Sequence, residues 1–449
     1  MSLSAGQANR ARIALQRFGL GPTPGLMEKI GDDPLAALKA ELDEPDVALI
    51  SNKALPSRAK AARLSQTDFS TSEQIRQLEL DARIDKHLSA RIGFVERLVL
   101  FWSNHFSMSV NKDQVIRATI GQLERDVIRK NVLGKFAAMH RGVMRHPAML
   151  RYLDNQDSKG PNSYRGQWSG GFNENLAREL MELHTLGSGA YSERDVTNMA
   201  LVLTGWSYIR SWEVGQEWAD APGGKAGEFY FREKWHEPGA IQLRGKSYPA
   251  GGIEQGEAVL TDLARAPETA QHIAFKLVRH FITDEPTPEM VNPVAKAFRQ
   301  SRGDLKQTAL ALISLPAAWS LEHKKIRTPY ELTIAQYRAL GTRYAPDRRW
   351  VFTEPLRAMN HLPWERPAPD GYSDENYSWL DPDGMTIRLD TAQLAVWEYG
   401  AASTAAPLAL ARSLYGESLS GQTKSALTWI TEKTPGYTVF FMSPEFQRR

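Results

Sequence analysis

Side chains that could do acid–base chemistry are concentrated in one predicted helix, residues 173–186. Asn173 is its predicted N-cap, and Gly187 follows its last residue. On a helical wheel, His184 falls inside the apolar face and Glu179 lies at that face's opposite edge. An inward histidine and carboxylate can form an acid–base pair. Glu174, Arg178 and Glu182, spaced i, i+4, form a predicted ion-pair stripe, so the candidate catalytic residues are Asn173, Glu174, Arg178, Glu179, Glu182 and His184.

A second histidine, His105, lies on the apolar stripe of the predicted helix 91–106. Facing helices build metal sites in helical bundles, so His105, Glu179 and His184 are candidate ligands of a divalent metal, with His236 as a further one. The Glu-x-x-His spacing occurs once, at Glu233, and the His-Glu-x-x-His zinc motif is absent. The alternative is structural, because buried His and Glu often hold neighbouring elements by hydrogen bonds.

Aromatic residues crowd two segments that lack helical periodicity, 207–252 and 344–384. Flat rings flanked by carboxylates suit a sugar, whose apolar ring hydrogens lie on the aromatic face while its hydroxyls bond the acids. Alternatively, the rings form small local cores under long loops, since Trp and Tyr are mostly buried. The candidate substrate-binding residues are Trp206, Trp212, Trp235, His236, Tyr372 and Trp379.

Composition excludes several classes of function. The 449 residues contain no Cys, so thiol nucleophiles, disulfides and zinc–thiolate sites are excluded. A net charge of +3 argues against nucleic acid as the main partner. No apolar stretch is long enough for a predicted membrane span, and the N-terminus lacks the apolar run of a secretory signal. Absence of a signal predicts a cytoplasmic protein.

Helical periodicity dominates the rest of the chain and predicts a mainly α protein. Ser192 and Asp195 resemble a capping box that starts one of the helices. We expect a main helical domain at 1–343 with an inserted loop or hairpin at 207–252. An irregular Pro/Asp/Gly-rich connection and C-terminal helices at 344–449 are expected to pack on the same core. Further predicted helices are 114–130, 134–144, 257–264, 269–282, 288–300, 304–315, 327–342, 390–414 and 423–431, and 51–72 is predicted as a polar loop.

Motifs along nearly the whole chain resemble domain-of-unknown-function family 1800. The most specific is the block from Asn173 to Gly187. The others are Arg17–Gly25, Phe101–Phe106, Arg145–Asn155, Asp195–Trp206, Phe275–His280, Pro369–Tyr372 with Trp379, and Ser443–Phe446. One departure concerns His236, after which the resemblance suggests Asp whereas Glu237 stands here. A role for His236 carried over from the family is therefore in doubt.

The resemblance implies an α-helical bacterial protein of a family without an assigned activity. It also implies a sulfatase-like genomic neighbour that is typically exported. Because members commonly carry a leader, an alternative location is outside the cytoplasm, reached together with a leader-bearing partner.

Three functions are consistent with these residues. The first is an enzyme that acts on a glycan or similar polar polymer, with Glu179 and Glu182 as acid–base groups. The second is a non-catalytic binding or assembly partner of the sulfatase-like protein. The third is a metal-dependent enzyme. The sequence does not decide whether the chain is an enzyme.

Overall fold

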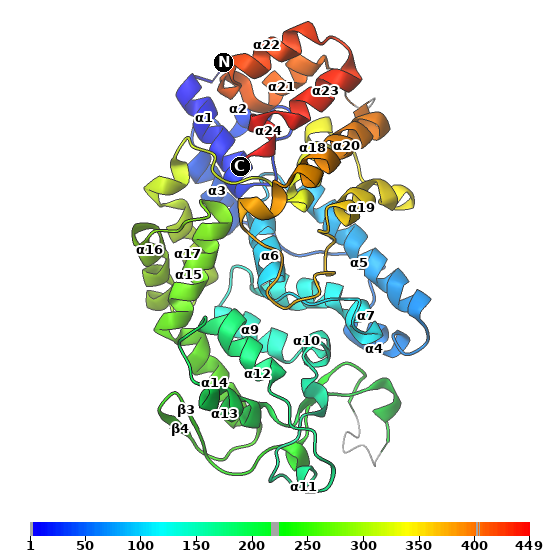
Figure 1. Cartoon of the computed structure of the whole chain (residues 1–449), viewed down its shortest axis with the longest axis vertical. Coiled ribbons are helices and arrows are strands. Elements are labelled where there is room, and N and C mark those ends of the chain that lie inside the picture. Colours follow the sequence, from blue (N-terminus) through cyan, green and yellow to red (C-terminus); the bar gives the residue numbers. More distant parts are fainter. Residues whose placement is uncertain (1–2, 217–223, 401–402, 404) are drawn as a thin grey trace.

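The chain folds into a mainly α-helical protein, as predicted (Figure 1). The computed structural model describes residues 3–216, 224–400, 403 and 405–449. α1, α22 and α24 lie at one end of the molecule, and the β-hairpins and α11 lie at the other (Figure 1). None of the helices in the described ranges combines the length and apolar character that crossing a bilayer requires. The division into domains at residue 343 stays a prediction.

The N-terminal part of the chain supplies α6 and the helices around it. α6 has a strong apolar stripe and buries Phe101 and Trp102. Asp68 and Asp113 cap α5 and α7 by accepting the backbone N–H groups of Thr71 and Val115. The helices are α1 (Ala5–Ile13), α2 (Leu26–Ile30), α3 (Pro34–Asp43), α4 (Arg58–Leu64), α5 (Phe69–Ser89), α6 (Phe94–His105), α7 (Gln114–Leu123), α8 (Arg129–Asn131), α9 (Phe136–Met144) and α10 (Pro147–Tyr152). The prediction of a loop over 51–72 was therefore wrong at α4 and the start of α5.

The middle of the chain contains short helices and the predicted insertion. α11 (Gly166–Ser169), α12 (Asn175–Glu179) and α13 (Glu193–Leu203) precede it, and the predicted capping box of Ser192 and Asp195 starts α13. Two antiparallel hairpins then pair β1 (Trp206–Tyr208) with β2 (Phe229–Phe231) and β3 (Ile241–Leu243) with β4 (Lys246–Tyr248). The hairpin predicted in 207–252 is confirmed, and residues 217–223 lie outside the described part.

Four helices that the sequence predicted follow next in the chain. α15 packs against α16, α16 against α17, and α14 against α9. Their bounds are α14 (Ile253–Arg265), α15 (Pro267–Phe281), α16 (Pro288–Gln300) and α17 (Leu305–Ile313). Each lies within a few residues of its predicted range, because apolar periodicity is strong in all four.

The C-terminal part differs from the prediction at two places. Residues 344–384 were expected to be irregular throughout, but α19 forms there and contains Pro355. The single helix predicted over 390–414 is two helices, α20 and α21. The bounds are α18 (Pro329–Leu340), α19 (Arg349–Ala358), α20 (Pro382–Tyr399), α21 (Pro407–Tyr415), α22 (Gly421–Trp429), α23 (Lys433–Met442) and α24 (Pro444–Gln447). Pro407 at the first position of α21 suits a helix start and not a helix interior.

One hydrophobic core connects these parts, from Ala8 in α1 to Phe446 in α24. A buried ionic network crosses it, in which Arg129 lies 2.9 Å from Glu96 and 3.2 Å from Glu124. Such charges are tolerated in a core because each has its partner. The core thereby fixes α6, α15 and α18 relative to one another.

Candidate functional site

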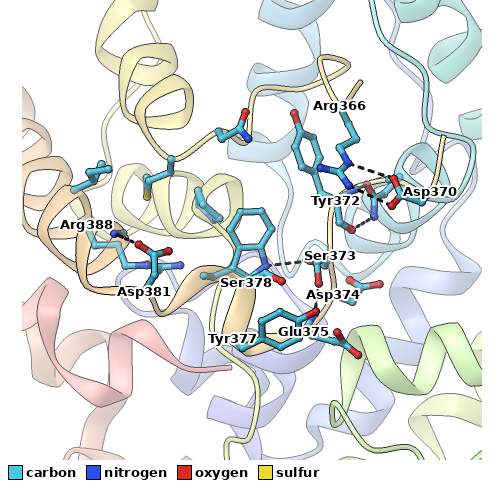
Figure 2. A pocket seen from close by; sticks show the side chains of 18 of the residues that line it. Arg366, Asp370, Tyr372, Ser373, Asp374, Glu375, Tyr377, Ser378, Asp381 and Arg388 are labelled. Carbon is cyan, nitrogen blue, oxygen red and sulfur yellow. Dashed lines mark hydrogen bonds and ion pairs between the residues drawn. The ribbon is translucent and has the colours of Figure 1, made fainter. Parts of the chain in front are cut away.

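A cavity of about 670 Å³ opens where α6, α15, α18, α19 and α20 meet the irregular segment 366–381. Arg388 and Asp381 lie on one side of it, and Arg366 and Asp370 lie on the other (Figure 2). Its volume is in the range of small-molecule sites. Most of its functional groups come from the 366–381 segment, so the contacts that hold this segment also shape the cavity.

Asn104, at the C-terminal end of α6, fixes the segment at Tyr372. The Asn104 side chain donates to the Tyr372 carbonyl at 2.8 Å and accepts the Tyr372 N–H at 2.7 Å. The preceding Gly371 has φ +83°, and a Cβ there would lie 2.5 Å from the Asn104 carbonyl oxygen. Only glycine permits this approach.

Asp374 attaches the same segment to α15. His280 donates from Nδ1 to the Asp374 carboxylate at 2.6 Å, and its Nε2 accepts from Arg97 at 3.2 Å. Lys325 bonds the Asp374 carbonyl oxygen and also pairs with Asp284. Burial opposes the ionised form of Asp374, but His280 and Lys325 hold its pKa below the ordinary value. Asp374 is therefore a carboxylate at neutral pH.

Two ion pairs and one lysine complete the polar wall. Arg279 lies 3.1 Å from Glu375, and Arg366 lies 3.2 Å from Asp370. Lys276, one turn before His280 on α15, also lines the cavity. Burial lowers the pKa of Lys276, although the charges of Asp374 and Asp370 act in the opposite direction.

Aromatic rings form the remaining part of the wall. Tyr372 and Trp379 enclose the ring of His361, with centroids 4.4 and 4.7 Å away. The Trp379 indole N–H donates to the Ser373 carbonyl at 3.0 Å. Tyr377 is 75% exposed at the rim, so its ring face is open to a ligand (Figure 2). Two predicted substrate-binding residues, Tyr372 and Trp379, thus lie together in the cavity.

The family model described as "Protein of unknown function (DUF1800)" matches residues 13–448. The chain belongs to this family. No curated protein and no solved structure matches the chain. The match extends over nearly the whole DUF1800 chain and includes every element that lines the cavity.

The predicted catalytic helix of this DUF1800 protein has a different geometry from the expected one. α12 begins at Asn175, and a π-helical segment, Leu180–Thr185, replaces its second half. Asn173 lies before the helix, where its side chain accepts the Asn175 N–H at 2.7 Å, so its assignment as N-cap was wrong by one residue.

The predicted ion-pair stripe on this helix is only partly correct. Arg178 lies 3.9 Å from Glu174 but pairs more closely with Glu193, at 2.8 Å. Glu182 accepts instead from Ser188 and Tyr191. The π-helical turn explains the difference, since it rotates Glu182 away from the i, i+4 position.

Glu179 lies near the cavity without lining it. It is half-buried and makes no hydrogen bond or ion pair with any residue in the described ranges. Burial raises the pKa of Glu179, and the charges of Glu182 and Asp370 raise it further. The charge of Asp370 thus acts on Glu179. The two carboxyl groups differ in their partners, because Asp370 has Arg366 as a counter-ion whereas Glu179 forms no ion pair in the described ranges.

The predicted metal ligands do not form a metal site. His105 and His184 are buried side by side, with ring centroids 5.9 Å apart, but His105 Nε2 donates to the His184 carbonyl at 3.2 Å. Among the described residues, no group of three or more His, Asp or Glu side chains could hold a metal ion. His236 lies in the insertion, where its Nδ1 donates to the Thr204 carbonyl at 3.0 Å. Burial lowers the pKa of His105 and His184, so both are neutral.

The described aromatic residues of the insertion do not line the cavity. Trp206 is fully buried against α14, which corrects the expectation that it is available to a substrate. Trp235 is half-buried, with the Arg232 guanidinium 4.7 Å above its ring. Trp212 is 55% exposed. For Trp206 and Trp235 the alternative of a local core is the correct interpretation.

The sequence indicated that carboxylates flank the aromatic residues of 344–384, but it did not identify the cations of the site, Lys276, Arg279 and Arg366. Phe275–His280 was recognised only as a family motif, although His272, Lys276 and His280 follow one another at i, i+4 spacing. Three basic side chains at i, i+4 spacing along one edge of an amphipathic helix are a detectable signal. Arg366 carries no such signal, because its position depends on an irregular backbone.

Proposed function

We propose that this DUF1800 protein is an enzyme that binds a carbohydrate-like substrate in the cavity and acts on it by carboxylate chemistry. The observation that carries the proposal is the composition of one cavity wall, where Tyr372, Tyr377 and Trp379 lie among the carboxylates of Asp370, Asp374 and Glu375. Rings cover the apolar face of a sugar, and carboxylates with their paired arginines bond its hydroxyls.

The acid–base pair that we assign is Asp370, which lines the cavity, and Glu179, which lies just outside the lining, so the scissile bond of the substrate would extend past the rim between them. Burial, followed by the charges of Glu182 and Asp370, raises the pKa of Glu179, which is the direction that suits a proton donor. Asp370, paired with Arg366, suits the role of the ionised partner. Glycosidic cleavage needs such a protonated and an ionised carboxyl group on opposite sides of the bond.

The first experiment measures oligosaccharide binding and cleavage. Binding is measured by calorimetry with a panel of neutral and acidic oligosaccharides, and cleavage by the release of reducing ends. Tyr377→Ala removes an exposed ring without a structural role, so we expect about two- to tenfold weaker binding. Glu179→Gln should retain binding and lower kcat by about 10²- to 10⁴-fold.

Trp212→Ala is the matched control, because Trp212 is an exposed aromatic residue outside the cavity. It should leave both binding and cleavage unchanged. Binding that is lost in Trp212→Ala and retained in Tyr377→Ala would move the site to the insertion. Unchanged turnover in Glu179→Gln would remove Glu179 from the mechanism.

A second function, capture of a partner protein, is supported by exposed rings at the other end of the molecule. α11 lies at this end (Figure 1). Its Trp168 is 83% exposed, and the nearby Tyr164 is 67% exposed. Such rings are typical of protein-binding surfaces. If an exported sulfatase-like protein is captured there, Trp168→Ala should abolish co-purification and leave oligosaccharide binding intact. The reverse pattern would contradict a separate partner surface.

A further inference from the structure

Lys276 stands out among the cations of the cavity because it has no partner. On the same edge of α15, His272 donates to the Leu183 carbonyl at 3.0 Å and His280 donates to Asp374. Lys276, between them, makes no hydrogen bond or ion pair with any residue in 3–216, 224–400, 403 or 405–449. Arg388, also in the cavity wall, donates to Gln447 at 2.9 Å and to the Arg327 carbonyl at 2.8 Å.

The surroundings of Lys276 favour its neutral amine. A half-buried ammonium without a counter-ion is unfavourable, so such a group tends to lose its proton. Burial lowers the pKa of Lys276 and the charge of Arg279 lowers it further, whereas Asp374 and Asp370 act in the opposite direction. On its inner side, Lys276 faces neutral imidazole rings, those of His105, His184 and His272. No carboxylate in the described part of the chain lies within ion-pair distance of Lys276.

We infer that Lys276 is a nucleophilic amine that forms an imine with an aldehyde or ketone group of the ligand in this cavity. The Lys276 nitrogen attacks the carbonyl carbon, and the oxygen takes up a proton to give a carbinolamine. The carbon–oxygen bond then breaks, and water leaves with the two hydrogens of the amine. The step needs no oxidant or reductant.

This inference rests on the proposed function only in placing the ligand in the cavity, and it deepens that function by naming the reactive group. The open-chain form of a sugar is an aldehyde or a ketone, so a sugar fits both the proposed carbohydrate site and the imine formed with Lys276. The polar wall of Asp374 and Glu375 suits the hydroxyl groups that flank such a carbonyl.

The test is reductive trapping on the full-length protein. Glyceraldehyde and cyanoborohydride are added at pH 7, and labelled lysines are mapped by mass spectrometry of peptides at successive times. We expect Lys276 to be labelled at least about tenfold faster than Lys39, an exposed lysine of α3. Lys276→Arg replaces the amine by a guanidinium that forms no imine and should abolish the fast phase, whereas Lys39→Arg should retain it.

Labelling of Lys276 at the rate of Lys39 or slower would overturn the inference. A fast phase that persists in a folded Lys276→Arg variant would also overturn it. Because trapping is read without any oligosaccharide, the outcomes are separable from those of the proposed function. Fast trapping without oligosaccharide binding rejects the carbohydrate proposal alone, and oligosaccharide turnover with slow trapping rejects the imine alone.

Discussion

At the scale of single residues, the cavity is shaped by side chains that bond backbone groups of a segment without regular structure. Asn104 is the clearest case, because its amide makes the same two hydrogen bonds to Tyr372 that a neighbouring strand would make. Regular elements satisfy their own backbone, whereas the 366–381 segment needs such side chains. The amide has both a donor and an acceptor, which no isosteric carboxylate provides.

Asn104→Ala should therefore loosen the cavity wall. It leaves the Tyr372 N–H and carbonyl without partners, and we expect a loss of about 1–3 kcal/mol in the free energy of unfolding. Amide hydrogen exchange in peptides from 366–381 should accelerate, which mass spectrometry can measure directly. Asn292→Ala, at an exposed position of α16, is the control and should change neither quantity. Equal exchange rates in the two variants would show that Asn104 does not hold the segment.

At the scale of elements, strong periodicity predicted α14 to α17 well, but it could not predict the π-helical segment Leu180–Thr185. One extra residue in a helical turn leaves the apolar pattern almost unchanged while it alters which side chains pair. The stripe of Glu174, Arg178 and Glu182 failed for this reason. α19 was missed because Pro355 lies inside it, and a proline argues against a helix interior even though Val351, Phe352 and Leu356 share its buried face.

The candidate site was predictable only in part. Tyr372 and Trp379 were found because aromatic residues in a long irregular segment are conspicuous in a sequence. The approach of α15 to 366–381 depends on contacts across about a hundred residues, such as His280 with Asp374. Single-sequence patterns contain no information on such pairs, so the cavity as a whole emerged only from the structure.

Gly187 provides a test of how the end of the π-helical segment fits against α15. Gly187 has φ +81°, and a Cβ there would lie 2.9 Å from His272 Nδ1. Gly189 has φ +84° but has nothing within 4 Å of the same position. Each substitution by Ala should lose about 1–2 kcal/mol of unfolding free energy through backbone strain. Gly187→Ala should lose about 1 kcal/mol more, because it displaces His272 from the Leu183 carbonyl.

Denaturant unfolding of both variants measures this difference. When His272 is already Ala, the Gly187→Ala substitution should no longer lose the additional unfolding free energy of about 1 kcal/mol, because the imidazole that the new Cβ would contact is gone. Equal destabilisation in Gly187→Ala and Gly189→Ala would mean that His272 moves aside freely and that the contact does not fix α15.

At the scale of the whole molecule, burial of histidine is a general property of this chain. Burial lowers the pKa of all ten histidines of the sequence, to about 4 for His272 and to about 3 for His140, His323 and His361. The native protein therefore holds its imidazoles neutral at pH values where the unfolded chain is protonated. This difference links stability to pH.

We expect stability to fall steeply as the pH decreases below 6.5. Above pH 6.5 the histidines are neutral in both states, so the folded protein has its full stability. Between pH 6.5 and about 3 only the unfolded chain takes up protons, and the free energy of unfolding therefore falls. One pH unit below 6.5, a histidine whose native pKa is about 3 or 4 costs roughly 1 kcal/mol, so His140, His272, His323 and His361 together cost several kcal/mol. Glu79, whose pKa burial raises to about 7, acts in the opposite direction, as do Glu41, Asp85 and Glu179, whose pKa values burial also raises. Urea unfolding at half-unit steps between pH 8 and 4.5 measures the slope.

His140 allows the contribution of one histidine to be isolated. Its ring is buried, stacks on Phe136 with centroids 5.6 Å apart, and neither ring nitrogen finds a hydrogen-bond partner among the described residues. His140→Phe keeps an aromatic ring there and removes the titrating group. The variant should match or exceed the wild-type stability at pH 5.5, and its slope between pH 6.5 and 5 should be lower by up to one proton. An unchanged slope would show that His140 takes up its proton in the native state as readily as in the unfolded chain.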